Sequence, residues 1–158
     1  MEYITLIISS IALGLSIYSV IESRKANRVS EEPHLAGHKN EGNNYFCFEL
    51  KNKGKGPAIF DNVETYYNNE RTGEKLKTLI DKALDGIRCK YSVMELGGNN
   101  IMGAGEVYKL LDITEIHKED IEKLKDIMET SEIDLKVIYK NAYGNMKSWA
   151  TNDNLIKI

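Results

Sequence analysis

The chain has 158 residues, of which 42% are hydrophobic and 28% charged, and its formal net charge at pH 7 is -3. From His34 onward it carries 18 Lys and Arg against 20 Asp and Glu. Domains that bind nucleic acid over a broad surface are usually strongly basic, so we expect no nucleic-acid partner. The two cysteines, Cys47 and Cys89, form neither a metal-binding spacing nor a disulfide framework, and they fit a reducing compartment. A single 47–89 bridge would be open to the chain only in an oxidising compartment.

Residues 3–21 are an apolar run without a formal charge. As an α-helix this run would be about 28 Å long, close to the hydrocarbon thickness of a bilayer. A cleaved signal peptide normally opens with positive charge and ends at a small-residue cleavage site, and an interfacial helix has a charged face. The run has none of these features. We therefore predict that residues 1–21 are an uncleaved transmembrane anchor whose partner is the lipid bilayer.

The flanks of the run and its small residues predict how the anchor is oriented and packed. Arg24, Lys25 and Arg28 follow the run, and such charges stay on the cytoplasmic side of a cell membrane. The N-terminus would then lie outside and the rest of the chain in the cytoplasm. Ser10 and Gly14 form a small-xxx-small pair that would let two copies of the helix pack closely as a homo-oligomer. Small residues are also common in membrane helices generally, so the oligomeric state stays open.

After the anchor, residues 22–33 are polar and predict a juxtamembrane linker whose start would continue the helix, and residues 34–158 would form one soluble domain. Alternating apolar residues predict strands in this domain, and helical spacing predicts two short amphipathic helices. The expected strands are 45–50, 58–67, 87–96, 106–113, 133–139 and 146–150, with a final edge segment at 155–156, and the expected helices are 74–84 and 117–129; residues 68–73 and 97–100 have turn composition.

This succession of elements predicts a mainly β fold. Antiparallel strands joined by turns most often pack as two sheets face to face, here with the two short helices inserted. A small barrel, or an α+β layer with both helices on one side, would also satisfy the pattern. Within the strands, Phe46 and Phe48 would face inward and Cys47 outward, and Ile59 would share a face with Val63.

Three segments are informative beyond their periodicity: residues 48–63 (FELKNKGKGPAIFDNV), 103–113 (GAGEVYKLLDI) and 134–145 (DLKVIYKNAYGN). They resemble segments of a diffuse class of small single-pass bacterial and prophage-borne membrane proteins with an immunoglobulin-like domain behind one N-terminal anchor. The first resembles the N-x-G-x-G-P-A signature of that class. The resemblance implies an immunoglobulin-like antiparallel β-sandwich with two short inserted helices, preceded by one transmembrane helix. It implies no activity, because most members of the class are uncharacterised.

The same glycine-rich loop is the best candidate for a binding site. Lys51, Lys53 and Lys55, with the backbone N–H groups of Gly54 and Gly56, could hold a phosphate or a nucleotide. However, the loop lacks the G-x-x-x-x-G-K-[ST] arrangement, and no predicted helix follows it. The competing interpretation is a tight connection between strands, in which the glycines adopt positive φ and the proline after them fixes the exit.

The other candidates for chemistry are weaker. His34 and His38 could share a metal only on a helix, and the glycine between them and the proline before them disfavour one. His117 and the acidic residues of 119–129, which alternate with lysines, are typical of a solvated surface. Neither cysteine has the partners of a catalytic nucleophile, and the sequence contains no G-x-S-x-G. We therefore predict no metal, no cofactor and no catalytic residue, so the protein would not be an enzyme.

Together these patterns predict a membrane-anchored, non-enzymatic interaction module. It would dock or regulate a protein partner, whose identity the sequence does not give, at the inner membrane surface, and the resemblance favours a role in phage–host conflict. One alternative is a ligand-sensing membrane effector whose Lys51–Lys55 loop binds a nucleotide. Another is an extracytoplasmic blocker of phage entry, which requires the opposite orientation in the membrane.

Overall fold

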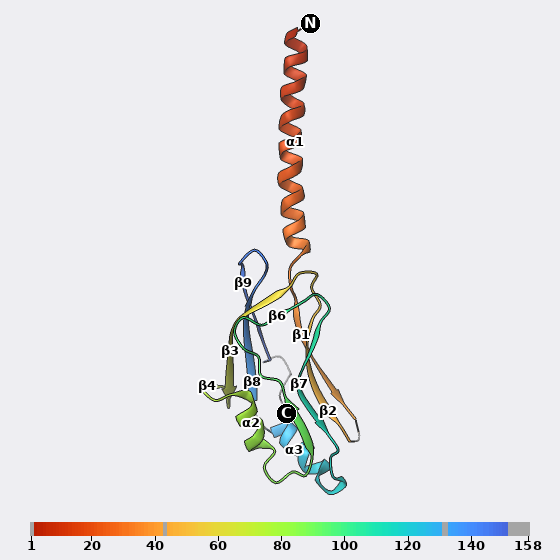
Figure 1. Cartoon of the computed structure of the whole chain (residues 1–158), viewed down its shortest axis with the longest axis vertical. Coiled ribbons are helices and arrows are strands. Elements are labelled where there is room, and N and C mark those ends of the chain that lie inside the picture. The colour runs from red at the N-terminus through yellow and green to blue at the C-terminus, as the bar shows by residue number, and fades with distance from the viewer. Residues whose placement is uncertain (1, 43, 131–132, 152–158) are drawn as a thin grey trace.

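The computed structural model describes residues 2–42, 44–130 and 133–151. Its first element is a long helix, α1 (Glu2–Ser30), which stands away from the rest of the molecule (Figure 1). The stretch Ile7–Asn27 of this helix is long and apolar enough to cross a membrane, and none of it is buried against the protein. At its C-terminal end this stretch continues six residues past Ile21, where the predicted run ended, because α1 itself continues to Ser30. Residues 22–30, predicted as the start of a linker, belong to the same helix.

Behind α1, the chain folds into two antiparallel sheets, as the mainly β prediction requires. One sheet has the order β1-β2-β7-β5 and the other β4-β3-β8-β9, with β6 pairing on β3. The strands of the first sheet are β1 (Leu35–Glu41), β2 (Phe46–Asn52), β5 (Lys90–Val93) and β7 (Val107–Thr114). Those of the second are β3 (Ala58–Tyr67), β4 (Glu70–Thr72), β6 (Ile101–Met102), β8 (Ile133–Lys140) and β9 (Met146–Ala150).

One hydrophobic core lies between the sheets. In β8 the buried side chains alternate with half-buried ones, as predicted, and include Leu135 and Val137. Phe60 of β3 and Tyr108 of β7 meet across the core, with ring centroids 6.3 Å apart in an edge-to-face arrangement, which is a favoured geometry for aromatic pairs. Burial of this shared core is what holds the two sheets together.

Two helical segments close the end of the sheets that is remote from α1 (Figure 1). Helix α2 (Leu76–Ala83) buries Leu76, Leu79 and Ile80, the apolar face expected from its sequence. The predicted helix 117–129 is a 3-10 turn, η1 (Lys118–Asp120), that leads into α3 (Ile121–Thr130).

Three strands were not expected. Strand β1 is polar, and pairing with β2 forms it at the sheet edge. Strand β4 lies inside the predicted turn 68–73, because Asn68 and Asn69, with φ of 51° and 63°, turn the chain in two residues and let Glu70 pair with Tyr67. Strand β6 has only two residues. The predicted strand 87–96 is ordered as a strand only over Lys90–Val93, and the predicted segment 155–156 lies outside the described residues.

The predicted side-chain faces are correct in part. Phe46 and Phe48 are buried as expected, but Cys47 between them is also buried, only 3% exposed. In β3 the expectation for Ile59 and Val63 is wrong, because the register with β8 shifts between Phe60 and Asn62. This bulge moves the inner face by one residue, so Phe60 before it and Thr65 after it are buried, whereas Ile59 is only half-buried.

Candidate functional site

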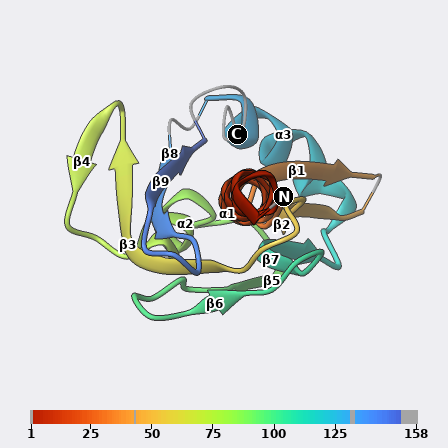
Figure 2. The same cartoon turned by 90° about the horizontal axis from the view of Figure 1, so that it is seen from above.

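The most informative site is the junction where α1 joins the β domain. The segment from Glu31 to His34 connects α1 with β1 and runs past the loop between β2 and β3. Seen from above, α1 rises over the middle of the domain, and the ends of several strands surround its base (Figure 2). The geometry of this junction explains the glycine-rich loop that the sequence singled out.

Asn52, at the end of β2, is the centre of the junction. Its side chain is fully buried, 0% exposed, and makes five hydrogen bonds with backbone groups. The Nδ2 group donates to the carbonyls of Gly56 (2.8 Å), Met102 (3.2 Å) and Gly103 (3.1 Å), and Oδ1 accepts from the N–H groups of Gly54 (3.0 Å) and His34 (3.1 Å). One side chain therefore holds together the loop, the end of β6 and the first residue after the juxtamembrane proline.

The glycines of the loop are required by close approach of the juxtamembrane segment. A Cβ atom on Gly54 would lie 2.2 Å from the carbonyl oxygen of Glu32, and one on Gly56 would lie 1.7 Å from that of Glu31. The expectation that these glycines adopt positive φ is wrong, since the positive-φ glycines among the described residues are Gly86, Gly105 and Gly144. Only glycine leaves room for the chain that leaves α1.

Further contacts fix the segment from the other side. The Lys53 N–H donates to the His34 carbonyl (2.7 Å). From the β8–β9 turn, the Tyr143 hydroxyl donates to the Glu31 carboxylate (2.6 Å), and Lys147 of β9 forms an ion pair with Glu32. The segment from Glu31 to His34 is thus bonded on one side to the β2–β3 loop and on the other to the β8–β9 hairpin, so it is not a flexible linker.

These bonds change the interpretation of the lysine loop. The N–H groups of Asn52, Lys53 and Gly54 already donate to Glu106, His34 and Asn52 oxygens. A phosphate cradled by these groups would have to displace the juxtamembrane segment. The side chains of Lys51, Lys53 and Lys55 are exposed, so an anion would meet ammonium groups only. Binding of a nucleotide here stays a prediction that the backbone geometry does not favour.

A groove of about 800 Å³ lies between the β3–β4 hairpin and the segment from Glu95 to Asn100. Its rim carries paired charges: Arg71 with Glu64 (3.1 Å) and Lys75 with Glu95 (3.2 Å). Glu64 also accepts a hydrogen bond from the Tyr66 hydroxyl, which raises the pKa of Tyr66. Because the charges are already neutralised in pairs, the groove is suited to a polar surface rather than to a bare ion.

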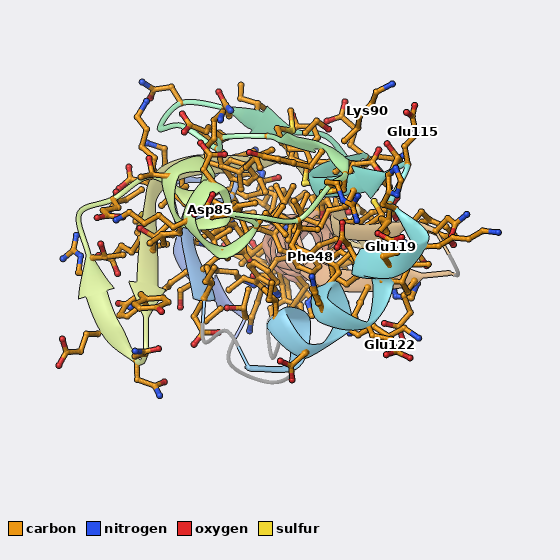
Figure 3. The ribbon with its side chains drawn as sticks, turned by 90° about the horizontal axis from the view of Figure 1, so that it is seen from below. Phe48, Asp85, Lys90, Glu115, Glu119 and Glu122 are labelled. Atoms are coloured by element: carbon orange, nitrogen blue, oxygen red, sulfur yellow. The ribbon has the colours of Figure 1, made fainter. Side chains whose placement is uncertain are left out.

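At the remote end of the domain, a buried acidic side chain holds α3 in place. Asp120 is 1% exposed and accepts two bonds from Arg88, one from Nε (2.8 Å) and one from the backbone N–H (3.2 Å). The guanidinium of Arg88 lowers the pKa of Asp120 to about 2. The expectation of a fully solvated acidic face is therefore wrong for Asp120. Figure 3 looks onto this end, where Glu119 and Glu122 lie around the start of α3.

Neither cysteine has the environment of a nucleophile. Both are free thiols, with Cys47 buried and Cys89 half-buried. Burial, and secondarily the carboxylate of Asp112, raises the pKa of Cys47 to about 11, and burial also raises the pKa of Cys89. A raised pKa keeps a thiol protonated, which is the opposite of activation.

The remaining predicted sites are open surfaces. His34 and His38 are exposed, and His38 lies in β1, where four residues span about 13 Å, too far to share a metal ion. Among the described residues, no group of three or more His, Cys, Asp or Glu could hold a metal ion. On α1, Ser10 and Gly14 are exposed, and a Cβ on Gly14 would meet nothing within 4 Å. Packing of a second helix on this face stays a prediction.

Comparison of the chain with protein-family models, with curated proteins and with solved structures gave no match. Function therefore has to be argued from this sequence and this geometry.

Proposed function

We propose that this protein is a single-pass membrane protein that holds a β-rich interaction domain in a fixed orientation at the inner surface of a cell membrane, where it docks or regulates a protein partner without catalysis. The observation that carries the proposal is the junction described above. An apolar helix with no buried residue in Ile7–Asn27 continues to Ser30 and is then bound by Asn52, Gly54 and Gly56. Such a mount would keep the domain at the membrane and define which of its surfaces a partner meets.

The cytoplasmic placement of the domain belongs to this proposal. It is supported by Arg24, Lys25 and Arg28, which follow the apolar run, because Lys and Arg beside a spanning helix are retained on the cytoplasmic side. One further observation agrees with it: Cys47 and Cys89 are both free thiols, as expected in a reducing compartment.

The immunoglobulin-like character of the domain and a role in phage–host conflict are also part of the proposal. Two antiparallel sheets around one core are compatible with that fold class. Asn52, Gly54 and Gly56 of the N-x-G-x-G-P-A motif contact the segment that follows α1, which suggests a physical reason for the resemblance. A motif that binds the end of an anchor helix is expected to recur in proteins that have such an anchor in front of a β domain.

The partner is proposed to bind at the 800 Å³ groove beside β4. The groove lies beside β4, which is at one side of the domain (Figure 1), where a protein diffusing along the membrane could reach it. Its paired charges, Arg71 with Glu64 and Lys75 with Glu95, are suited to exchanging salt bridges with a polar protein surface.

Two experiments test this function. Protease added to intact cells should leave the domain uncut, whereas removal of the domain would refute the cytoplasmic placement and favour the extracytoplasmic blocker. For the groove, a photo-crosslinking amino acid at Lys75 is compared with one at Lys118, which is exposed at the remote end. A discrete crosslinked species from position 75 that Arg71→Glu abolishes, and that position 118 does not give, is the expected result. Equal products from both positions would contradict the groove as the docking surface.

A further inference from the structure

We infer that the end of the β domain beside α1 is a lipid-binding face that rests on anionic headgroups. This inference deepens the proposed function and depends on α1 spanning the membrane. Three parts of the chain form the face: the loop of residues 51–57, the β8–β9 turn, and the short strand β6. Figure 1 shows the β8–β9 turn level with the lower end of α1, and the loop beside it.

The distance between this face and the bilayer follows from the length of α1. If Ile7–Asn27 is the spanning stretch, Ser30 lies about 5 Å beyond the hydrocarbon, and if the span ends at Ile21, Ser30 lies about 14 Å beyond it. The headgroup layer on each side of a bilayer is about 5–8 Å thick. The β8–β9 turn, which is level with the end of α1, is therefore placed within or just below the headgroups.

The composition of the face suits that position. A row of directly paired residues crosses β6, β3, β8 and β9, and pairing puts their side chains on one face: Ile101, Ile59, Lys140 and Met146. Ile101 and Met146 are 58% and 55% exposed, and the nearby Tyr143 is 44% exposed. Exposed aliphatic and tyrosine side chains next to lysines are typical of residues that sit at a membrane interface.

The charges of this face favour contact with anionic lipid headgroups. Within the part of the chain that the structure describes, Lys51, Lys53 and Lys55 form no ion pair. Of the acidic groups at this end, Glu32 pairs with Lys147 and Asp61 with Lys140, while Glu31 and Glu106 accept hydrogen bonds from the neutral Tyr143 hydroxyl and Gly103 N–H and keep their charge. The unpaired positive charge is thus concentrated on the loop beside the helix, where anionic lipid would attract it.

The test uses the full chain in lipid nanodiscs, which expose both faces of the bilayer and so do not depend on cellular orientation. A fluorescent dye is attached at Ala142→Cys or Met146→Cys near α1, or at Glu122→Cys at the remote end, in a Cys89→Ala background. Cys47 remains, because it is buried, and burial raises the pKa of its thiol to about 11, so that little of it is the reactive thiolate near neutral pH. The discs contain phosphatidylcholine alone or with phosphatidylglycerol, and a fraction of the lipid carries a nitroxide quencher on its headgroup.

Dyes at 142 and 146 should lose most of their fluorescence, more so with phosphatidylglycerol, and the dye at 122 should not. Lys53→Gln with Lys55→Gln should remove the gain due to phosphatidylglycerol, whereas the matched pair Lys118→Gln with Lys125→Gln should not. Equal quenching at near and remote positions, or identical behaviour of the two lysine pairs, would overturn the inference. Protein that co-elutes with the discs but is unquenched at 142 and 146 would overturn the lipid-binding face alone. Protein that fails to co-elute would overturn the membrane anchor itself.

Discussion

The carbonyl oxygen of Glu31 lies 1.7 Å from the point that a Cβ atom would occupy on Gly56. No side chain fits at this position unless the chain leaving α1 moves away from the loop. The contact therefore makes the glycine a direct determinant of how the helix is attached to the domain.

Replacing Gly56 by Ala should loosen the junction, because the added methyl group displaces the Glu31 carbonyl. We expect the free energy of unfolding of the full chain in detergent to fall by about 1–3 kcal/mol, as for other overpacked sites. Hydrogen exchange at the Lys53 amide, which donates to His34, should accelerate. Gly97→Ala is the control, since a Cβ there meets nothing within 4 Å. Equal behaviour of the two variants would show that the close approach does not constrain the junction.

Asn52→Leu should destabilise the protein strongly. The leucine has a similar volume but leaves the backbone groups bonded by Asn52 buried without partners, at a cost of about 1–3 kcal/mol for each group that water cannot reach. Asn52→Asp should also be destabilising, because a carboxylate cannot donate to the carbonyls of Gly56, Met102 and Gly103. Chemical denaturation of both variants, with the exposed Asn44→Asp as control, measures the effect. An Asn52→Asp protein as stable as the control would contradict the assigned bonds.

Stability should fall in acid through Asp120. Its pKa in the folded protein is about 2, below the value of about 3.9 in an unfolded chain. The unfolded state therefore binds the proton first as the pH falls, and the stability due to the charged carboxylate, fully present above about pH 5, is lost between about pH 4 and pH 2. In Asp120→Asn, thermal unfolding should begin lower at neutral pH and depend less on pH across this range. A matched Glu122→Gln variant should keep the profile of the parent protein; an unchanged profile in Asp120→Asn would refute the role of the buried pair.

Gly14→Ile tests oligomerisation through the anchor. A Cβ atom at position 14 meets nothing within 4 Å in the single chain, so the expected effect of the isoleucine is on contacts between chains. If Ser10 and Gly14 form a helix–helix interface, crosslinking of the full chain in membranes should drop, because close approach of two backbones needs small residues. Leu13→Ile, about a quarter turn away, is the control and should leave crosslinking unchanged. Persistence of the crosslinked species in Gly14→Ile would argue against this interface.

Elements with strong periodicity were predictable from the sequence alone. Strands β3 and β9 have the predicted bounds, and β8 shows the predicted alternation because its inner face is fully covered. Strand β1 could not be predicted, because pairing with β2 rather than its own composition makes it a strand. The bulge in β3 was equally hidden, since it follows from the register with β8, a strand that lies far along the chain.

The sequence drew attention to the glycine-rich loop, but the structure gives these glycines a role that the sequence did not predict. The sequence singled out Gly54 and Gly56 as residues of special conformation, whereas their importance is the space they leave. That space is filled by Glu31 and Glu32, more than twenty positions earlier in the chain. The burial of Asp120 was missed for a similar reason, because its partner, Arg88, lies 32 positions earlier in the chain.

Because the segment after α1 is bonded to the β domain, the helix and the domain are expected to move together. A helix longer than the local hydrocarbon tilts to match it, and its tilt changes with bilayer thickness. Since the hydrogen bonds around Asn52 tie the segment after α1 to the domain, the domain would swing with the helix, and the groove beside β4 would be displaced with it. Bilayer thickness would thus set the height at which a partner finds its docking surface.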